Sequence, residues 1–161
     1  MTHAHKPLAL TMGDPSGIGP ELTLKAYAAR DAYALPPFFV IADPAHLARV
    51  ARALSLDIAF ETVTPQQAPN VFVRALPVVP LDCVVNGAAG VAGRPQPEDA
   101  KATIQSISRA VASVVGGVAR AVVTNPIAKS VLYAAGFAHP GHTEFLAELA
   151  HRHYGGTHRS V

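Results

Sequence analysis

Apolar and polar residues follow two different periods in the first third of the chain. Two short, continuous apolar runs, at residues 8–12 and 38–42, are typical of strands buried in a parallel sheet. A helical pattern from Pro20 to about Arg30 lies between them. After the second run, Asp43 and Pro44 provide a helix cap and a first helical residue. The apolar positions that follow at helical spacing are Leu47, Val50, Ala51 and Leu54. The pattern therefore predicts strand, helix, strand, helix.

The middle of the chain is less regular. Residues 58–63 and 71–76 are predicted as two further strands. From Pro77 to Pro97, four prolines and the loop at 87–93 predict irregular structure or edge strands. A long helix is predicted next, and Gly116-Gly117 ends it. Its apolar stripe consists of Ile104, Ile107, Val111 and Val114 or Val115.

The last part of the chain repeats the alternation. Residues 121–124 are predicted as a buried strand, and Asn125-Pro126 as the cap and start of a helix that runs through Ala135. Thr143 is predicted to cap a final helix with apolar positions Leu146, Leu149 and Ala150. Strands and helices in this order indicate an α/β fold, an open and largely parallel sheet covered by helices on both faces.

The composition is that of a globular protein. Half of the 161 residues are apolar, 15% are charged, and the formal net charge is +2. This length suffices for one good-sized core, or for one domain and part of another. The sequence has no cluster of Lys and Arg of the kind found at nucleic-acid interfaces. Its longest apolar stretch, near 110–119, is too short to span a bilayer. A single cysteine, Cys83, excludes an internal disulfide, so we expect a reducing compartment, the cytoplasm.

The first candidate site is the glycine-rich turn Met12-Gly13-Asp14-Pro15-Ser16-Gly17-Ile18-Gly19-Pro20-Glu21. Its amides can face an anion at the start of a helix, or its glycines can serve only a tight turn. The spacing G-x-x-x-G-x-G matches neither the dinucleotide nor the phosphate-loop fingerprint. Asp43 follows the second strand, the position at which dinucleotide-binding folds carry a ribose-binding acid, but we interpret it as a helix cap.

Two later segments are also candidates. Thr124-Asn125-Pro126-Ile127-Ala128-Lys129 follows a strand, where ligands of open α/β sheets bind, although Asn125 can simply cap and Lys129 can simply be solvated. His139-Pro140-Gly141-His142-Thr143-Glu144 presents an imidazole and a hydroxyl that can bind a polar substrate or relay a proton, or it can be only a helix start. His151, His153 and His158 are interpreted as solvated, since residues two apart on a helix point in different directions.

Together, these three motifs resemble the 4-hydroxythreonine-4-phosphate dehydrogenase family of vitamin B6 synthesis. They are the glycine turn, Val123-Thr124-Asn125-Pro126-Ile127-Ala128-Lys129 and Pro140-Gly141-His142-Thr143-Glu144-Phe145-Leu146. The turn is also similar to the opening of isocitrate and isopropylmalate dehydrogenases, which share the fold. The resemblance covers the whole chain but about the first half of the family's length. It implies two α/β domains, with residues 1–134 as an incomplete first domain and 135–161 as the start of a second.

The resemblance also implies a site and a reaction. His142 and Thr143 match the family's substrate-binding pair, Asp14, Asn125 and Lys129 are supporting candidates, and no catalytic residue is assigned. The implied reaction is NAD- or NADP-dependent oxidation and decarboxylation of 4-phosphooxy-L-threonine to 3-amino-2-oxopropyl phosphate. It uses a divalent metal (zinc, magnesium or cobalt) whose ligands lie in the family's second half, and the family's enzymes are homodimers. We therefore expect no metal site in these 161 residues, and an inactive chain on its own.

Other functions fit the same motifs. A paralogous dehydrogenase acting on a four-carbon sugar-acid phosphate or a cis-dihydrodiol is one alternative. From other classes, a phosphate acyltransferase resembles this fold without using NAD, and a non-catalytic binding module remains open. The Pro140-Gly141-His142-Thr143-Glu144 motif argues against the transferase.

Overall fold

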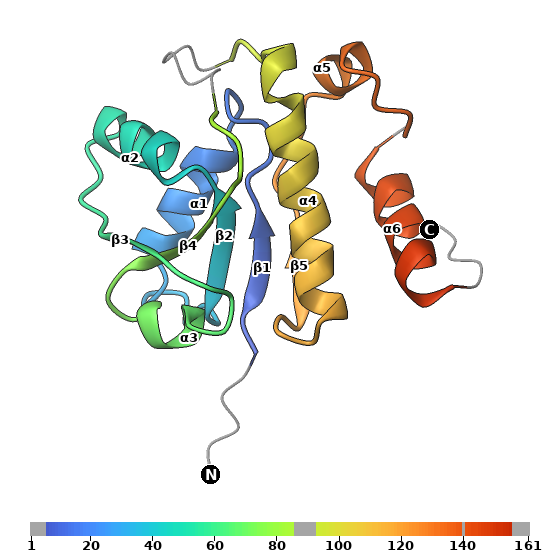
Figure 1. Cartoon of the computed structure of the whole chain (residues 1–161). Helices are drawn as coiled ribbons and strands as arrows, with labels where there is room; N and C mark the ends of the chain where they lie inside the picture. Colours follow the sequence, from blue (N-terminus) through green and yellow to red (C-terminus); the bar gives the residue numbers. More distant parts are fainter. Residues whose placement is uncertain (1–5, 86–92, 140, 156–161) are drawn as a thin grey trace.

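The computed structural model describes residues 6–85, 93–139 and 141–155. Within these residues, five parallel strands form one sheet in the order β3-β4-β2-β1-β5, with helices on both faces (Figure 1). The elements are β1 (Leu8–Thr11), α1 (Gly19–Ala28), β2 (Phe38–Ala42), α2 (Pro44–Ala53), β3 (Phe60–Thr62), α3 (Ala68–Val71), β4 (Leu76–Pro80), the 3₁₀ turn η1 (Pro97–Asp99), α4 (Ala100–Val115), β5 (Ala121–Val123), α5 (Lys129–Ala134) and α6 (His142–Tyr154). The predicted open, parallel α/β sheet is confirmed.

The central strands separate two apolar layers. Phe39 and Ile41 of β2 point to the face covered by α3 and α4, whereas Val40 and Ala42 point to the face covered by α1 and α2. All four side chains are fully buried. Because both faces of β2 are covered, its sequence is a continuous apolar run instead of an alternating one, which is why the run at 38–42 predicted the strand correctly.

The strand predicted at 71–76 is wrong. Ala68–Val71 is a helical turn, and β4 begins only at Leu76 and continues into the proline-rich stretch that was expected to be irregular or an edge. β4 instead lies inside the sheet, between β3 and β2.

The register of β4 explains how a central strand accommodates two prolines. Leu76 N donates to Ala59 O, and Val63 N donates to Val78 O, so the even-numbered positions bond toward β3. Pro80 follows this alternation but lies beyond the end of β3, and Pro77 faces β2 before the pairing with β2 begins at Val78. Neither proline therefore occupies a position at which a neighbouring strand needs a backbone N–H donor.

The apolar stripe predicted for the long helix serves two surfaces. Ile107 and Val111 of α4 pack in one cluster with Phe145 and Leu149 of α6, and Val122 of β5 packs against the same cluster. The sheet side of α4 instead carries small residues such as Ser106 and Ala110, both fully buried. These small residues let the helix approach the strands closely, and the larger ones bind α6 to its outer side.

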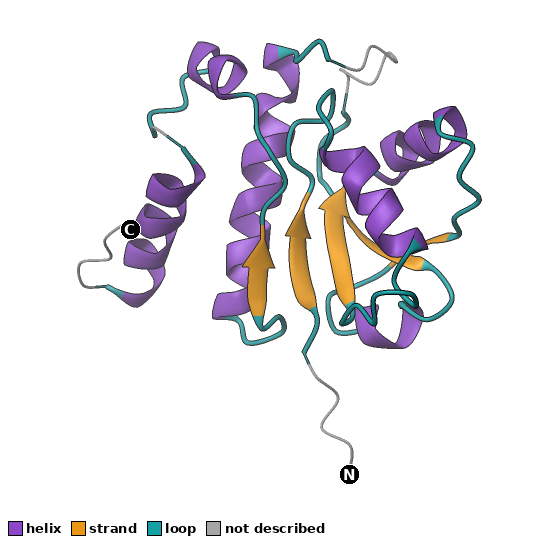
Figure 2. Cartoon of the chain, turned by 180° about the vertical axis from the view of Figure 1, so that it is seen from behind, coloured by secondary structure: helices purple, strands orange, loops and turns teal. Residues whose placement is uncertain are grey.

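The strand predicted at 121–124 exists as β5, but it is not buried. β5 is the edge of the described sheet, and Val123 is 43% exposed. Figure 2 shows the face on which α1 and α2 lie, and no described helix covers β5 there. An apolar hollow of about 180 Å³ opens on that face, with Leu8, Leu10 and Val123 among its lining residues.

Candidate functional site

The glycine-rich turn after β1 uses several of its own amides. Asp14 N donates to Pro126 O at 2.9 Å, Ser16 N to Asp14 Oδ1 at 2.8 Å, and Gly17 N to Asp14 O at 3.0 Å. These three donors are bonded inside the chain and do not point at an anion. The structure therefore supports the tight turn at these positions rather than the anion cradle.

Close packing of the loop after β5 explains two glycines of the turn. Gly13 has φ +75°, and a Cβ there would lie 2.6 Å from Pro126 O and 2.8 Å from Asn125 Cβ. A Cβ on Gly19 would lie 2.6 Å from Met12 O and 3.0 Å from Asn125 Cβ. Contacts this short exclude any side chain, so the first motif is shaped to receive the second.

Asn125 fastens the two motifs together and does not cap a helix. Its side-chain Nδ2 donates to Thr11 O and to Thr23 Oγ1, both at 2.9 Å, and its backbone N donates to Thr11 Oγ1 at 3.0 Å. The prediction of a cap at Asn125 is wrong, because α5 begins at Lys129 with Ala128 before it. Buried backbone groups at the end of β1 outcompete the helix for this amide.

The carboxyl group of Asp14 lies in the same buried region, 6% exposed. Burial raises the pKa of Asp14 above its ordinary value, and the nearby Asp99 adds to the effect, while the hydrogen bond from Ser16 N opposes it. A carboxyl group whose neutral form is favoured can donate a proton as well as accept one. Asp14 thus remains a chemically competent candidate at the carboxyl end of β1.

Two small polar residues of α4 anchor this end of the sheet, and neither was predicted from the sequence. Ser106 Oγ donates to Ile41 O at 2.7 Å and accepts from Met12 N at 2.9 Å, and Thr103 Oγ1 donates to Gly13 O at 3.2 Å. Their signal in the sequence is a serine and a threonine three residues apart on the face of a helix that otherwise carries small apolar residues.

The second group of candidates lies where α5 and α6 begin. Lys129 is the first residue of α5, and Gly141 directly precedes α6. A Cβ built on Gly141 would lie 3.5 Å from Lys129 Nζ, so the ammonium group sits against the start of α6. Figure 1 shows α5 near the end of the sheet to which the strands point, as expected of a ligand site in an open α/β sheet.

His142 has an incompletely satisfied imidazole. Its Nε2 is buried and has no hydrogen-bond partner among the described residues. Burial and the positive charge of Lys129 lower the pKa of His142, so the ring is held neutral near pH 7. A neutral imidazole with an unused nitrogen can form a hydrogen bond with a polar ligand.

Thr143 is exposed, and its hydroxyl forms no hydrogen bond with any residue that the structure describes. The prediction that Thr143 caps α6 is wrong, because the helix begins one residue earlier, at His142, and Gly141 occupies the cap position without a side-chain bond. The turn proposed at Pro140 lies outside the described residues. The hydroxyl of Thr143 is thus exposed, one position after His142 in α6.

His139 has a structural role. Its Nε2 lies 2.9 Å from Glu148 Oε2, and its ring packs against Phe137 and Phe145 at centroid distances of 5.0 and 5.1 Å. The aromatic contacts and the acidic partner hold the segment before α6 against the helix. Of the two histidines in this motif, His142 is the one with a buried ring nitrogen that has no partner among the described residues.

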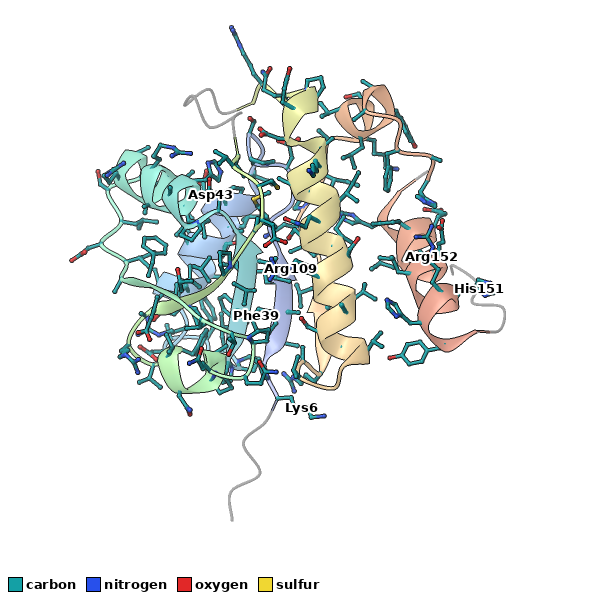
Figure 3. All side chains as sticks on the ribbon, in the orientation of Figure 1. Lys6, Phe39, Asp43, Arg109, His151 and Arg152 are labelled. Carbon is teal, nitrogen blue, oxygen red and sulfur yellow. The ribbon has the colours of Figure 1, made fainter. Side chains whose placement is uncertain are left out.

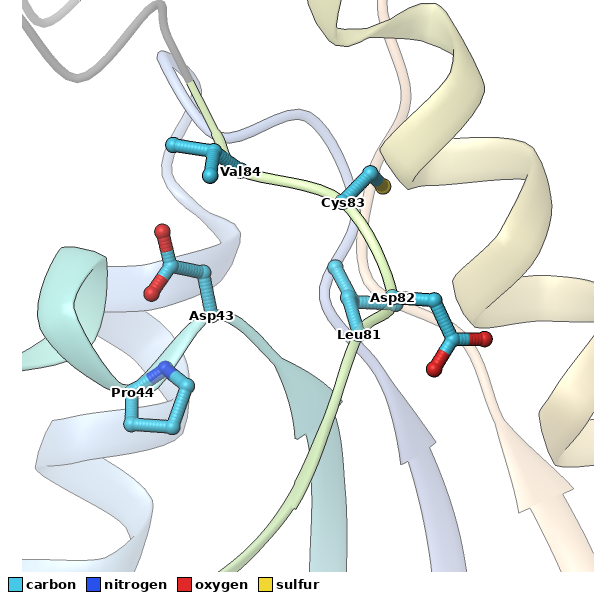
Figure 4. Close-up of a pocket in the computed structure, with 6 residues that line it drawn as sticks. All are labelled: Asp43, Pro44, Leu81, Asp82, Cys83 and Val84. Atoms are coloured by element: carbon cyan, nitrogen blue, oxygen red, sulfur yellow. The ribbon is translucent and has the colours of Figure 1, made fainter.

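Asp43 is the helix cap that the sequence predicted. Its Oδ1 accepts from Ala45 N at 2.8 Å, and its Oδ2 accepts from Val85 N at 3.3 Å. Asp43 lines a pocket of about 280 Å³ at the ends of β2 and β4. Figure 4 shows that the carboxylate of Asp82, another lining residue, points away from Asp43. Both carboxylate oxygens of Asp43 are engaged, so it is not presented as a free acid for a ribose.

No group of three His, Cys, Asp or Glu side chains within the described ranges is placed to hold a metal ion. His151 and His153 lie exposed on α6, and Figure 3 shows His151 on the side of the molecule away from Asp43. His158 lies outside the described residues. Among the helices that the structure describes, none has the length and apolar content needed to cross a membrane.

The predicted site residues therefore form two groups. Asp14 and Asn125 meet where the turn after β1 packs on the loop after β5, and Lys129 lies near His142 where α5 and α6 begin. Thr143 follows His142 in α6 and is exposed. Only three residues, 126–128, separate the two groups along the chain. An open parallel sheet with polar groups at its carboxyl end defines the class: an α/β protein of the kind that binds small ligands at that edge.

Comparison with known proteins identifies the family within that class. The family described as "Pyridoxal phosphate biosynthetic protein PdxA" matches residues 34–157, and the chain belongs to this family. A protein of Methylorubrum populi named 4-hydroxythreonine-4-phosphate dehydrogenase is 51% identical over 152 residues, which are 94% of this chain and 43% of the relative. The chain thus spans less than half the length of the curated relatives that it matches.

Solved structures agree with this assignment. The crystal structure of a 4-hydroxythreonine-4-phosphate dehydrogenase from Burkholderia phymatum superposes with a TM-score of 0.77 at 27% identity, over 91% of this chain and 44% of that one. A terephthalate 1,2-cis-dihydrodiol dehydrogenase from Burkholderia xenovorans superposes with a TM-score of 0.68 at 26% identity, over 90% and 40%. Both known chains extend well beyond the part that this one matches.

Proposed function

We propose that this chain is the substrate-binding first part of a dehydrogenase that oxidises and decarboxylates 4-phosphooxy-L-threonine to 3-amino-2-oxopropyl phosphate in vitamin B6 synthesis. The supporting observation is the 51% identity, over nearly the whole chain, to a relative named for that activity. The enzyme acts in the cytoplasm as a homodimer, and the small phosphorylated substrate is its partner.

In this proposal, His142 and Thr143 bind the substrate. The unpartnered Nε2 of a neutral His142 and the free hydroxyl of Thr143 supply hydrogen bonds to polar groups of the ligand. Lys129 supports them from the first turn of α5. Asn125, and the backbone of Asp14, act indirectly, because their bonds fix the loop that leads to α5.

The proposed reaction needs NAD or NADP as the hydride acceptor and a divalent metal (zinc, magnesium or cobalt) to polarise the oxygen. The described residues do not fit either group: no three potential ligands converge, and the amides of Asp14, Ser16 and Gly17 are used internally. No step is therefore assigned to them here. We expect the residues that bind the metal and the cofactor in the part of the family's length that these 161 residues do not match.

The test compares two purified proteins. The whole reading frame that contains this sequence is expected to form NADH or NADPH from 4-phosphooxy-L-threonine, and the 161-residue chain alone is expected to be inactive. Replacing His142 with Ala in the longer protein should raise KM more than it lowers kcat if the ring binds the substrate. Robust NADH formation by the 161-residue chain alone would contradict the proposal.

A second candidate is a dehydrogenase that acts on a cis-dihydrodiol, supported by the similarity to the terephthalate 1,2-cis-dihydrodiol dehydrogenase. Steady-state rates of the longer protein with both substrates discriminate the two. A kcat/KM at least about tenfold higher for the phosphorylated amino acid supports the first candidate, and the reverse ratio supports the second.

A further inference from the structure

His46 is a buried histidine that the proposed function does not use. It lies in the first turn of α2 and is 3% exposed. Neither of its ring nitrogens forms a hydrogen bond with a described residue. The carbonyl group of Pro15, in the glycine turn, faces the ring without hydrogen-bond geometry. Because a buried imidazole without hydrogen bonds loses its hydration and gains nothing in return, its charged form is disfavoured.

Three charged side chains act on the ring, and together they do not reverse this preference. Arg49 lies three residues further along α2, and its positive charge opposes a second one on His46. Asp43, which caps α2, and Asp99, at the end of η1, favour a proton on the ring, but neither accepts a hydrogen bond from it. Burial outweighs both carboxylates, so the pKa of His46 lies below its ordinary value.

The ring lies where the glycine turn meets α2. Figure 1 shows α2 next to α1, the helix that begins within this turn. Within the described residues, the buried Asp and His side chains are Asp14, His46 and Asp99, and Asp99 interacts with both of the others. This junction therefore holds the buried acids and the buried histidine of three separate segments. A protonated ring needs water, and from this position it reaches water only if the turn and α2 separate.

We propose that His46 is a pH-sensitive switch, which keeps the glycine turn on α2 while its ring is neutral and releases the turn when the ring is protonated. Because the folded chain disfavours the proton, this stabilising contact is complete above the unfolded pKa of 6.5 and is lost as the pH falls through the lower pKa of the folded state. The switch does not depend on which substrate the longer protein oxidises.

The test measures amide hydrogen exchange of the 161-residue chain at pH 7 and pH 5, with each rate compared with that of an unprotected amide at the same pH. We expect the protection of Ser16 N and Gly17 N, which are bonded within the turn, to fall by about tenfold at pH 5, because the open form binds a proton that the closed form excludes. His46→Gln, whose side chain does not titrate, should lose less than about twofold. His151→Gln, which removes an exposed histidine of α6, is the matched control and should behave as the unmodified chain does.

Three results would overturn the inference: unchanged protection of the turn at pH 5, an equal loss in His46→Gln, or an equal loss at Phe39 and Ile41 of β2, which would mean that the whole fold opens. A measurement without any substitution guards against a variant that misfolds. The ring signals of His46 in the unmodified chain should titrate with a pKa below 6.5 by NMR, and the amide signals of the turn should change over the same pH range. A pKa of His46 at or above 6.5 would also overturn the inference.

Discussion

Individual residues of the glycine turn are selected by what packs against them. Gly13 combines a positive φ with a close approach to Pro126, whereas Gly19 faces close contacts alone. Gly136 has φ +84°, and a Cβ there would meet nothing within 4 Å, so it isolates the backbone effect. These three glycines therefore separate two reasons for glycine, a positive φ and a lack of room for a Cβ, which the sequence alone does not distinguish.

Alanine at these positions should give a graded loss of stability. Gly136→Ala is expected to cost about 1 kcal/mol, the usual penalty of a left-handed backbone. Gly19→Ala and Gly13→Ala should cost about 2 kcal/mol or more, because Met12 O or Pro126 O must move. Urea unfolding followed by circular dichroism measures the three values. Equal costs for Gly13→Ala and Gly136→Ala would show that the contact with Pro126 is unimportant.

The buried carboxyl group of Asp14 should make stability depend on pH. Because its pKa is raised in the folded chain, its favourable contribution is full below the unfolded value, 3.8, and is lost as the pH rises through the folded value. Asp14→Asn keeps an oxygen for Ser16 N and removes the charge, so it should unfold at higher urea than the unmodified chain at pH 7. The difference should shrink toward pH 4.

Asp57→Asn, at an exposed carboxylate, is the control for that comparison and should change little at either pH. An Asp14→Asn chain that is less stable than the unmodified one at pH 7 would mean that the charged form is favoured in the fold. Comparing the two variants at the same ionic strength keeps the screening of surface charges constant.

At the scale of elements, the sequence predicted those helices and strands whose ends are set by neighbouring residues. β1, α1, β2 and α2 were predicted within about two residues, because apolar runs, Pro20 and the Asp43-Pro44 cap act on their own neighbourhoods. The start of α5 was misplaced, because Asn125 bonds to β1 instead of to a helix. The start of α6 was misplaced because Gly141, and not Thr143, occupies its cap position. Such long-range competition leaves no trace in the spacing of residues.

The candidate site shows the same division. The motif around His142 was chosen as a candidate from its residue types, but the approach of Lys129 to Gly141 depends on how the starts of α5 and α6 are placed, which the residue types do not specify. The prediction of β4 failed for another reason. Its register against β2 and β3 permits the two prolines, and the sequence alone does not specify this register.

The cap of α2 offers a test at this scale. Asp43→Ala removes the bonds to Ala45 N and Val85 N and should destabilise the chain by about 1 kcal/mol, whereas Asp43→Asn keeps an acceptor and should lose a few tenths. Urea unfolding gives both values. If Asp43→Ala were as stable as the unmodified chain, the capping role would be wrong and a ligand role for the carboxylate would need to be considered again.

At the scale of the whole molecule, the sheet ends in an edge that the described residues leave open. β5 pairs with β1 on one side, and on its other side the backbone groups are unpaired within the described sheet. The apolar hollow lined by Leu8, Leu10 and Val123 adjoins this edge. Exposed parallel edges with apolar faces promote association.

We therefore expect the 161-residue chain to associate with rising concentration, and Val123→Lys to shift it toward the monomer, because the ammonium group opposes strand addition and burial of the hollow. Sedimentation velocity over a tenfold range of concentration measures this. Val73→Lys is the control, since Val73 is 77% exposed, against 43% for Val123, but lies outside the strands. If exposure alone drove association, Val73→Lys would reduce it at least as much; if the open edge drives it, only Val123→Lys will. A chain that stays monomeric without either substitution would contradict the prediction.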